Sequence, residues 1–189
     1  MRGEVMVMIG ILKKIAAKGK IDEVTEHIKE VVEAGEKIVV FAWHKEIVYA
    51  LKEAIPGSVT VVGDDSMDAR QSAVDSFQSD PKTQVIICNI KSGGVGITLT
   101  ASSRVAFIEL PWHPADADQC EDRCHRIGQK NSVQCSYFLG ANTIDEYIYD
   151  IIEKKRAIVN QVTGAEEEIE TVERNMVDQL IGIFKQEKF

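Results

Sequence analysis

The sequence predicts an α/β domain in which a mainly parallel sheet lies between two layers of helices. Short runs rich in Val, Ile and Phe alternate along the chain with segments of helical periodicity. Because parallel strands need a crossover between them, this alternation favours a three-layer fold with the sheet covered on both faces. A second observation agrees, since 44% of the 189 residues are hydrophobic, which is ample for a buried core.

The elements follow from the pattern in chain order. Residues 1–35 predict two helices that lead into the sheet, because five apolar side chains are spaced for one buried face. These are Ile21, Val24, Ile28, Val31 and Val32. The predicted strands are residues 38–43, 59–62, 84–89, 104–110 and 133–139. The helices predicted between them are residues 44–55, 68–78 and 114–126.

The end of the chain is predicted to be helical. Thr143 and Glu146 have the T-x-x-E spacing of a capping box, and the helix they start can extend to about Val162, before Gly164 ends it. A second helix is expected from about Ile169, and its apolar stripe can fold back on the domain or meet a missing lobe. The stripe consists of Val172, Met176, Val177, Leu180, Ile183 and Phe184. The simplest division is one domain, residues 1–163, with a helical extension, residues 164–189.

Composition excludes several classes of protein. The apolar runs have strand length, far below the ~20 residues needed to cross a bilayer, and no signal peptide opens the chain. Four cysteines without close, even pairing indicate reduced thiols. We therefore expect an intracellular protein without a membrane partner, cytoplasmic or nucleoid-associated in a bacterium or phage. The net charge of −8 predicts weak DNA binding by this chain alone, because affinity for DNA depends on neutralising phosphates.

The segment from Gln119 to Gln129, QCEDRCHRIGQ, is the most informative in the chain. On a helix that starts at Pro114, Gln119, Arg123 and Arg126 would lie within about 60° of one another. Two guanidinium groups on one face suit the oxygens of a transferring phosphoryl group, because arginine stays charged and donates in a planar fork. The alternative is a pair of surface salt bridges. The candidate partners for these are Asp118, Glu121 and Asp122.

Four blocks of sequence carry a resemblance to a known family. They are KIVVFAWHKEIVYAL at 37–51, MDARQSAVDSF at 67–77, SGGVGITLTAS at 92–102 and PWHPADADQCEDRCHRIGQ at 111–129. In their order and spacing the chain resembles the second RecA-like lobe of the Swi/Snf-type ATP-dependent DNA translocases of helicase superfamily 2. The resemblance implies a RecA-like (P-loop NTPase-like) fold and an ATPase site shared with an N-terminal RecA-like lobe.

The resemblance also implies roles for single residues that match the family motifs. Arg126 would be the arginine finger, with Arg123 as its partner at the phosphates and Gln119 as an orienting hydrogen-bonding residue. Gly94 and Gly96 would lie near the adenosine side of the nucleotide. The residues implied at the DNA backbone are His44, Lys45, Arg70, Lys91, Ser92 and Thr98.

ATP with Mg²⁺ is the implied cofactor, held mainly by the N-terminal lobe, and double-stranded DNA is the implied second partner. The sequence contains no Gly-Lys-Ser or Gly-Lys-Thr, so no Walker A lysine is placed to hold the phosphates. No Asp-Glu-x-His block for magnesium occurs either. We therefore expect the isolated chain to be inactive, since an arginine finger acts only where another surface holds the nucleotide.

Other interpretations are open at this level. The chain can be a non-catalytic nucleic-acid or protein-binding module that kept the fold, or a zinc-stabilised domain built on Cys120, Cys124, His125 and Cys135. Structural zinc sites need a second compact pair of ligands, and its lack favours small buried hydrophobes for the cysteines.

Local alternatives also exist. The glycines at 93–96 can form an ordinary turn after a strand, Trp43 can pack under a loop, and Arg70 can pair with Asp68 or Asp75 on its own helix. The family usually has Trp-Asn-Pro where this chain has Trp-His-Pro at 112–114. Thr98 and the Glu-Asp-Arg at 121–123 look closer to the annealing-helicase branch.

Overall fold

The computed structural model describes residues 2–93 and 96–159, together with residues 171, 174, 175, 177, 178, 181 and 182. The strands are β1 (Ile38–Ala42), β2 (Val59–Val61), β3 (Val85–Asn89), β4 (Arg104–Phe107) and β5 (Gln134–Tyr137). The helices are α1 (Arg2–Gly19), α2 (Ile21–Glu33), α3 (Lys45–Ala54), α4 (Met67–Ser79), α5 (Ile90–Gly93), α6 (Pro114–Glu121) and α7 (Ile144–Val159).

In the described part of the chain the strands form one sheet in the order β2-β3-β1-β4-β5, and every pair of neighbours is parallel. Each strand lies within the range predicted for it. All carboxyl ends therefore lie at one edge of the sheet, the carboxyl edge, and all amino ends at the opposite amino edge. The connection after β1 leads to one side and that after β4 to the other. In open α/β sheets, ligands bind where connections diverge in this way.

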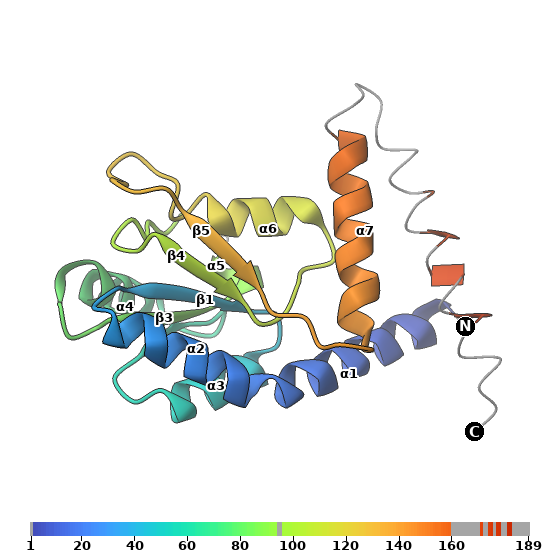
Figure 1. Cartoon of the computed structure of the whole chain (residues 1–189), viewed down its shortest axis with the longest axis horizontal. Coiled ribbons are helices and arrows are strands. Elements are labelled where there is room, and N and C mark those ends of the chain that lie inside the picture. The colour runs from blue at the N-terminus through green and yellow to red at the C-terminus, as the bar shows by residue number, and fades with distance from the viewer. Residues whose placement is uncertain are drawn as a thin grey trace.

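Both faces of the sheet are buried, because side chains of the central strand β1 alternate between two hydrophobic clusters. Val39 and Phe41 belong to the cluster that includes residues of α4, α6 and α7. Ile38, Val40 and Ala42 belong to the cluster that includes residues of α2 and α3. Figure 1 shows α2 and α3 on one side of the sheet and α6 on the other. The predicted three-layer α/β fold is confirmed.

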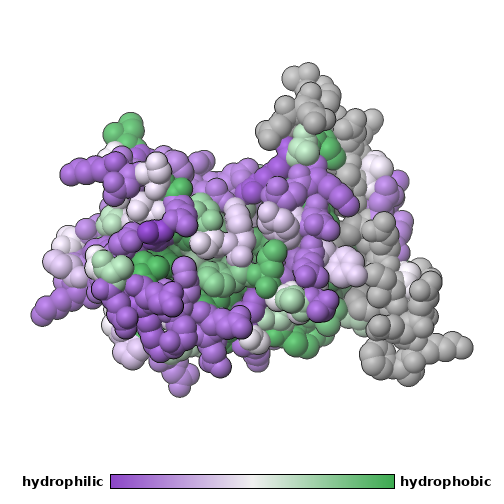
Figure 2. Space-filling view, viewed as in Figure 1, coloured by the Kyte–Doolittle hydropathy of each residue, from purple (hydrophilic) through white to green (hydrophobic). Residues whose placement is uncertain are grey.

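The two leading helices are present as predicted. α2 buries Val24, Ile28 and Val31. α1 leaves large apolar side chains exposed, namely Met6, Val7, Met8, Ile11 and Ile15. Figure 2 shows hydrophobic residues gathered along the lower edge of the molecule, where α1 runs. No helix among the described residues combines the length and the apolar character needed to span a membrane.

The helix predicted over residues 114–126 is shorter than expected, because α6 ends at Glu121. Beyond it, the amides of Arg123 and Cys124 bond to carbonyls three residues earlier, which is a tighter geometry than an α-helix. The carbonyl of Arg123 accepts a hydrogen bond from the amide of Leu99. This long-range bond uses a carbonyl that a continuing helix would need for itself, and the chain turns away.

α7 starts where the sequence predicts, and the Thr143 hydroxyl accepts a hydrogen bond of 3.2 Å from the amide of Asp145. The predicted end near Val162, the break at Gly164 and most of the apolar stripe lie outside the described residues. Of that stripe, Val177 is described and is buried.

The cysteines behave as small hydrophobic residues, as predicted. Cys88, Cys120 and Cys124 are fully buried in the cluster on the α6 face, and Cys135 packs against it. Burial raises the pKa of Cys120, Cys124 and Cys135 to about 12. His125 is exposed. Within the described ranges no three His, Cys, Asp or Glu side chains form a group that could hold a metal ion.

Candidate functional site

The motifs at 92–102 and 119–129 lie directly against each other. The amide of Leu99 donates to the carbonyl of Arg123 over 2.9 Å. One residue away on the first motif, the Thr98 hydroxyl accepts a hydrogen bond of 3.0 Å from Arg126 Nη1. Backbone and side-chain bonds together hold the loop after α6, residues 122–129, against the segment that follows β3. We call residues 122–129 the arginine loop.

The two arginines do not share a helix face, and the prediction that they do is wrong because α6 ends before either of them. Arg123 is only 6% exposed, and its burial, with the charge of Arg126 as a smaller cause, lowers its pKa. Arg126 is half-buried, so its guanidinium is the more accessible of the two. Gln119 is exposed on the last turn of α6.

Two of the acidic residues near the arginines are engaged from another helix. Arg156 of α7 donates to Asp118 over 2.8 Å and to Glu121 over 3.4 Å. The hydroxyl of Tyr137 also donates to Glu121. These contacts fasten the end of α6 to α7 and β5, immediately before the arginine loop.

Two glutamines fix the end of the first motif. Gln129 donates to the carbonyls of Thr100, Ser102 and Cys124, and its own oxygen accepts from the amides of residues 130 and 131. Gln78 of α4 accepts from the amide of Ala101 and donates to the Thr100 hydroxyl. The segment from Thr100 to Ser102 is therefore held from both sides.

A second group of polar residues surrounds Trp43 and His44 at the carboxyl edge. Glu109 accepts from both of their amides and from the His44 ring. Asn89 donates to the carbonyl of Trp43 over 2.7 Å. Two ammonium groups lie over the ring of Trp43, with Lys13 Nζ at 4.7 Å and Lys91 Nζ at 4.6 Å from its centroid.

Sequence reasoning missed Glu109, Asn89 and Lys13. Glu109 and Asn89 carry a signal that could have been read, because each is a polar residue inside an apolar run predicted to be a buried strand, where such residues are rare unless they are bonded. Lys13 carries no such signal, since a lysine in an N-terminal helix is ordinarily on the surface.

The other site residues predicted from the sequence make separate contacts. Lys45 pairs with Asp64 over 2.5 Å. Arg70 donates to the carbonyls of Gly63 and Asp65 rather than lying along its own helix toward Asp68 or Asp75. Buried Ser92 donates to Asn89 over 3.3 Å. Gly96 is exposed with φ +71°, a conformation that favours glycine, while Gly94 lies outside the described residues.

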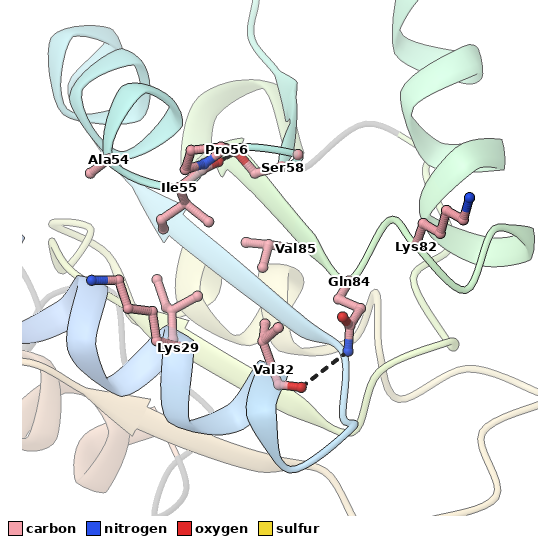
Figure 3. Close-up of a pocket in the computed structure, with 11 residues that line it drawn as sticks. Lys29, Val32, Ala54, Ile55, Pro56, Ser58, Lys82, Gln84 and Val85 are labelled. Carbon is pink, nitrogen blue, oxygen red and sulfur yellow. Dashed lines mark hydrogen bonds between the residues drawn. The ribbon is translucent and has the colours of Figure 1, made fainter.

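Two cavities lie at the amino edge. One, of about 420 Å³, is lined by residues 35–37, 100–103 and 128–131, beside the end of the arginine loop. The other, of about 210 Å³, lies between α2, the turn after α3 and the start of β3. Figure 3 shows it with Lys29 and Lys82 on opposite sides and Gln84 bonded to the carbonyl of Val32. The residues that line this second cavity include none of the predicted site residues.

The parallel sheet with helices on both faces, and a loop with two arginines beside the segment after β3, define a RecA-like lobe. The helicase conserved C-terminal domain family matches residues 19–128, more than half of the chain. The chain belongs to this family, and the resemblance to Swi/Snf-type lobes noted in the sequence is confirmed.

Similar curated proteins agree with this assignment. The chain is 35% identical over 175 residues to the human DNA annealing helicase and endonuclease ZRANB3, with 89% of this chain and 16% of that protein covered. It is 32% identical over 150 residues to a SWI/SNF-related matrix-associated actin-dependent regulator of chromatin subfamily A-like protein 1 from Drosophila melanogaster, with 77% of this chain and 20% of that protein covered. The chain thus spans a fifth or less of the length of these relatives.

Solved structures show the same fold. The Sulfolobus solfataricus SWI2/SNF2 ATPase core domain superposes with a TM-score of 0.69 at 25% identity, over 89% of this chain and 38% of that one. The C-terminal part of the Fun30 ATPase domain superposes with a TM-score of 0.68 at 24% identity, over 87% of this chain and 54% of that one.

Proposed function

We propose that this chain is the second motor lobe of an ATP-dependent DNA translocase or helicase. In this proposal it supplies arginine side chains to an ATPase site shared with an N-terminal RecA-like lobe, in the same polypeptide or a separate one. Its relatives include a protein named a DNA annealing helicase, which supports the class of activity. The whole motor would be a hydrolase acting on ATP, and this lobe alone would not hydrolyse it.

The observation that carries the proposal is the hydrogen bond from Arg126 to Thr98. It leaves Arg126 half-buried and held by one nitrogen, so its other donors are available to a charged group at the surface. The residues present fit the triphosphate of ATP, because a guanidinium pairs well with phosphate oxygens. ATP would supply the anionic γ-phosphoryl group on which charge develops during transfer.

The two arginines have different roles in this proposal. Arg126 lies nearer the surface and would stabilise that developing charge directly. Arg123 is buried, and it would add positive charge behind Arg126 while its carbonyl holds Leu99 in place. Gln119, Gly94 and Gly96 stay candidates for orienting the nucleotide, and Mg²⁺ would be held mainly by the other lobe.

The carboxyl edge is the proposed contact with duplex DNA. Lys91, which follows β3, is exposed beside Trp43. His44, which follows β1 directly after Trp43, is partly exposed. Lys45, Arg70, Ser92 and Thr98 complete the proposed set. Because Lys91 lies at this edge and Thr98 accepts the bond from Arg126, one motif would both contact the DNA backbone and hold the arginine.

The test is DNA-stimulated ATP hydrolysis by this chain joined to its N-terminal lobe, with and without Arg126→Ala. We expect duplex DNA to raise turnover and the substitution to lower it by ~10³-fold or more, with nucleotide binding retained. Lys29→Ala is the control, since Lys29 is an exposed cation paired with Glu26 far along the chain from the motifs. Two results would instead indicate a binding module with a motor's fold. One is an equal rate of hydrolysis with and without Arg126→Ala, and the other is DNA binding that does not change with the bound nucleotide.

A further inference from the structure

Glu109 is a buried carboxylate with an unusual set of donors. Its side chain is only 1% exposed, and it lies just past the end of β4. Oε2 accepts from the amide of Trp43 over 2.9 Å and from the amide of His44 over 2.8 Å. Oε1 lies 2.5 Å from Nδ1 of the same histidine. Burying a carboxylate costs several kcal/mol unless it is fully bonded, so this arrangement holds His44 by both backbone and ring.

A residue of β3, the strand on the other side of β1, also holds this segment. Asn89, at the end of β3 and 2% exposed, donates to the carbonyl of Trp43 over 2.7 Å. Residues 43 and 44 are therefore fixed by a buried amide from β3 and a buried carboxylate from β4. This is the place where the connections after β1 and β4 diverge, and open α/β sheets bind ligands there.

The contact fixes which ring nitrogen of His44 reaches the surface. A carboxylate can only accept, so Nδ1 carries the proton that lies toward Glu109. The His44 side chain is 23% exposed, which leaves Nε2 as the nitrogen available to a ligand. The exposed ammonium group of Lys91, over the ring of Trp43, adds positive charge beside it.

We propose that Glu109 is a positioning residue: it accepts from Nδ1–H of His44 and orients the ring so that, in the doubly protonated form of His44, Nε2–H donates to a backbone phosphate of duplex DNA. The identity of the ligand rests on the proposed function, whereas the orientation of His44 does not. The first experiment therefore needs no DNA. Two-dimensional ¹H–¹⁵N spectra of the imidazole groups, recorded on this chain, report which nitrogen of His44 is protonated.

We expect protonated Nδ1 in the wild type and a mixture of tautomers in Glu109→Gln, with Glu109→Asp restoring the wild-type pattern. A bare Nδ1 in the wild type overturns the proposal, and this result needs no variant to fold. An unchanged spectrum in Glu109→Gln overturns it as well.

The second experiment is the affinity for a labelled DNA duplex at low salt. Removing an acidic side chain should by itself strengthen DNA binding, because it lowers the repulsion of phosphates. Positioning predicts the opposite sign, with Glu109→Gln and His44→Ala each weakening binding roughly tenfold and the double variant no weaker than His44→Ala. The slope of log affinity against log salt should also fall by about one.

The outcomes separate the two proposals. Tighter binding by Glu109→Gln overturns the positioning role at the DNA. No DNA binding by the wild type, with the expected histidine spectrum, overturns the DNA assignment within the proposed function but leaves the role of Glu109 in orienting His44 supported.

Discussion

Thr98 Oγ1 lies 3.0 Å from Arg126 Nη1, which joins the segment after β3 to the arginine loop by one side-chain hydrogen bond. The neighbouring backbone bond from Leu99 to Arg123 holds the same two segments whether or not the side chains change. The hydroxyl of Thr98 therefore affects the orientation of the Arg126 guanidinium more than it affects the stability of the loop.

Replacing Thr98 by valine, which has nearly the same shape, should keep the fold and release Arg126. We expect ATP turnover by the two-lobe protein to fall by about tenfold, less than the loss in Arg126→Ala, because the guanidinium remains but samples more orientations. Steady-state hydrolysis at saturating DNA measures this. Thr98→Ser keeps the hydroxyl and should stay close to wild type, and equal losses in the valine and serine variants would contradict the prediction.

Gln129 should contribute strongly to stability, because its amide bonds to three carbonyls and two amides around the arginine loop. We expect Gln129→Ala to lower the free energy of unfolding by about 1–3 kcal/mol, since buried partners lose their bonds. Urea unfolding measures the change. Gln71, whose amide meets Asp75 on the exposed side of α4, is the matched control, and Gln71→Ala should change stability by about 0.5 kcal/mol or less.

Lys20 and Asp145 form a buried ion pair of 2.5 Å, and Lys20 also donates to the carbonyls of Ile108 and Phe138. Lys20→Met should destabilise the fold by about 3–5 kcal/mol, because it leaves the Asp145 carboxylate buried without its counter-charge. In the exposed pair of Lys29 with Glu26, Lys29→Met should change stability by about 0.5 kcal/mol or less. Similar midpoints for the two variants in urea would refute the assignment of Lys20 as a structural cation.

Lys13 should make stability depend on pH. Burial, opposed by the weaker attraction of Glu109, lowers the pKa of Lys13 from 10.5 to about 8. Between these values the unfolded chain binds a proton that the native chain does not, so the contribution of Lys13 to stability rises with pH across this window. Below about pH 8 the contribution is constant, because Lys13 is protonated in both states.

The buried cysteines have the opposite effect on how stability depends on pH. Native thiols with a pKa of about 12 stay protonated while unfolded thiols ionise, so their contribution to stability falls as pH rises above about 8.5. The measurement is therefore the difference in unfolding free energy between wild type and Lys13→Met. We expect this difference to change in favour of wild type by up to about 3 kcal/mol across the window. A constant difference would contradict the lowered pKa of Lys13.

The fold could be predicted because its signals are local. Apolar runs such as residues 38–43 and 84–89 set the strands, and the spacing of Val24, Ile28 and Val31 set the buried face of α2. The end of α6 could not be predicted, since Pro114 and the helical spacing both favour continuation. The bond from Leu99 to Arg123 that replaces it joins residues far apart in sequence.

The candidate site was predicted in its parts but not in its connections. The motifs identified Arg126 and Thr98 separately, and only the fold brings them into contact. Glu109 and Asn89 act on Trp43 from neighbouring strands, so their role depends on the strand order β3-β1-β4, which no single stretch of sequence encodes. Side chains that hold other residues are harder to find from sequence than those in recognisable motifs.

Ile127 follows Arg126 directly and is 104% exposed. The native thiols are buried or half-buried, and the high pKa values of Cys120, Cys124 and Cys135 keep them in the unreactive protonated form at pH 8. A cysteine introduced by Ile127→Cys would have an ordinary pKa and full access to reagents. A maleimide fluorophore should therefore attach at that one position, beside the arginine, without any change to the folded core. In the proposed two-lobe motor, its signal would test whether nucleotide brings the lobes together.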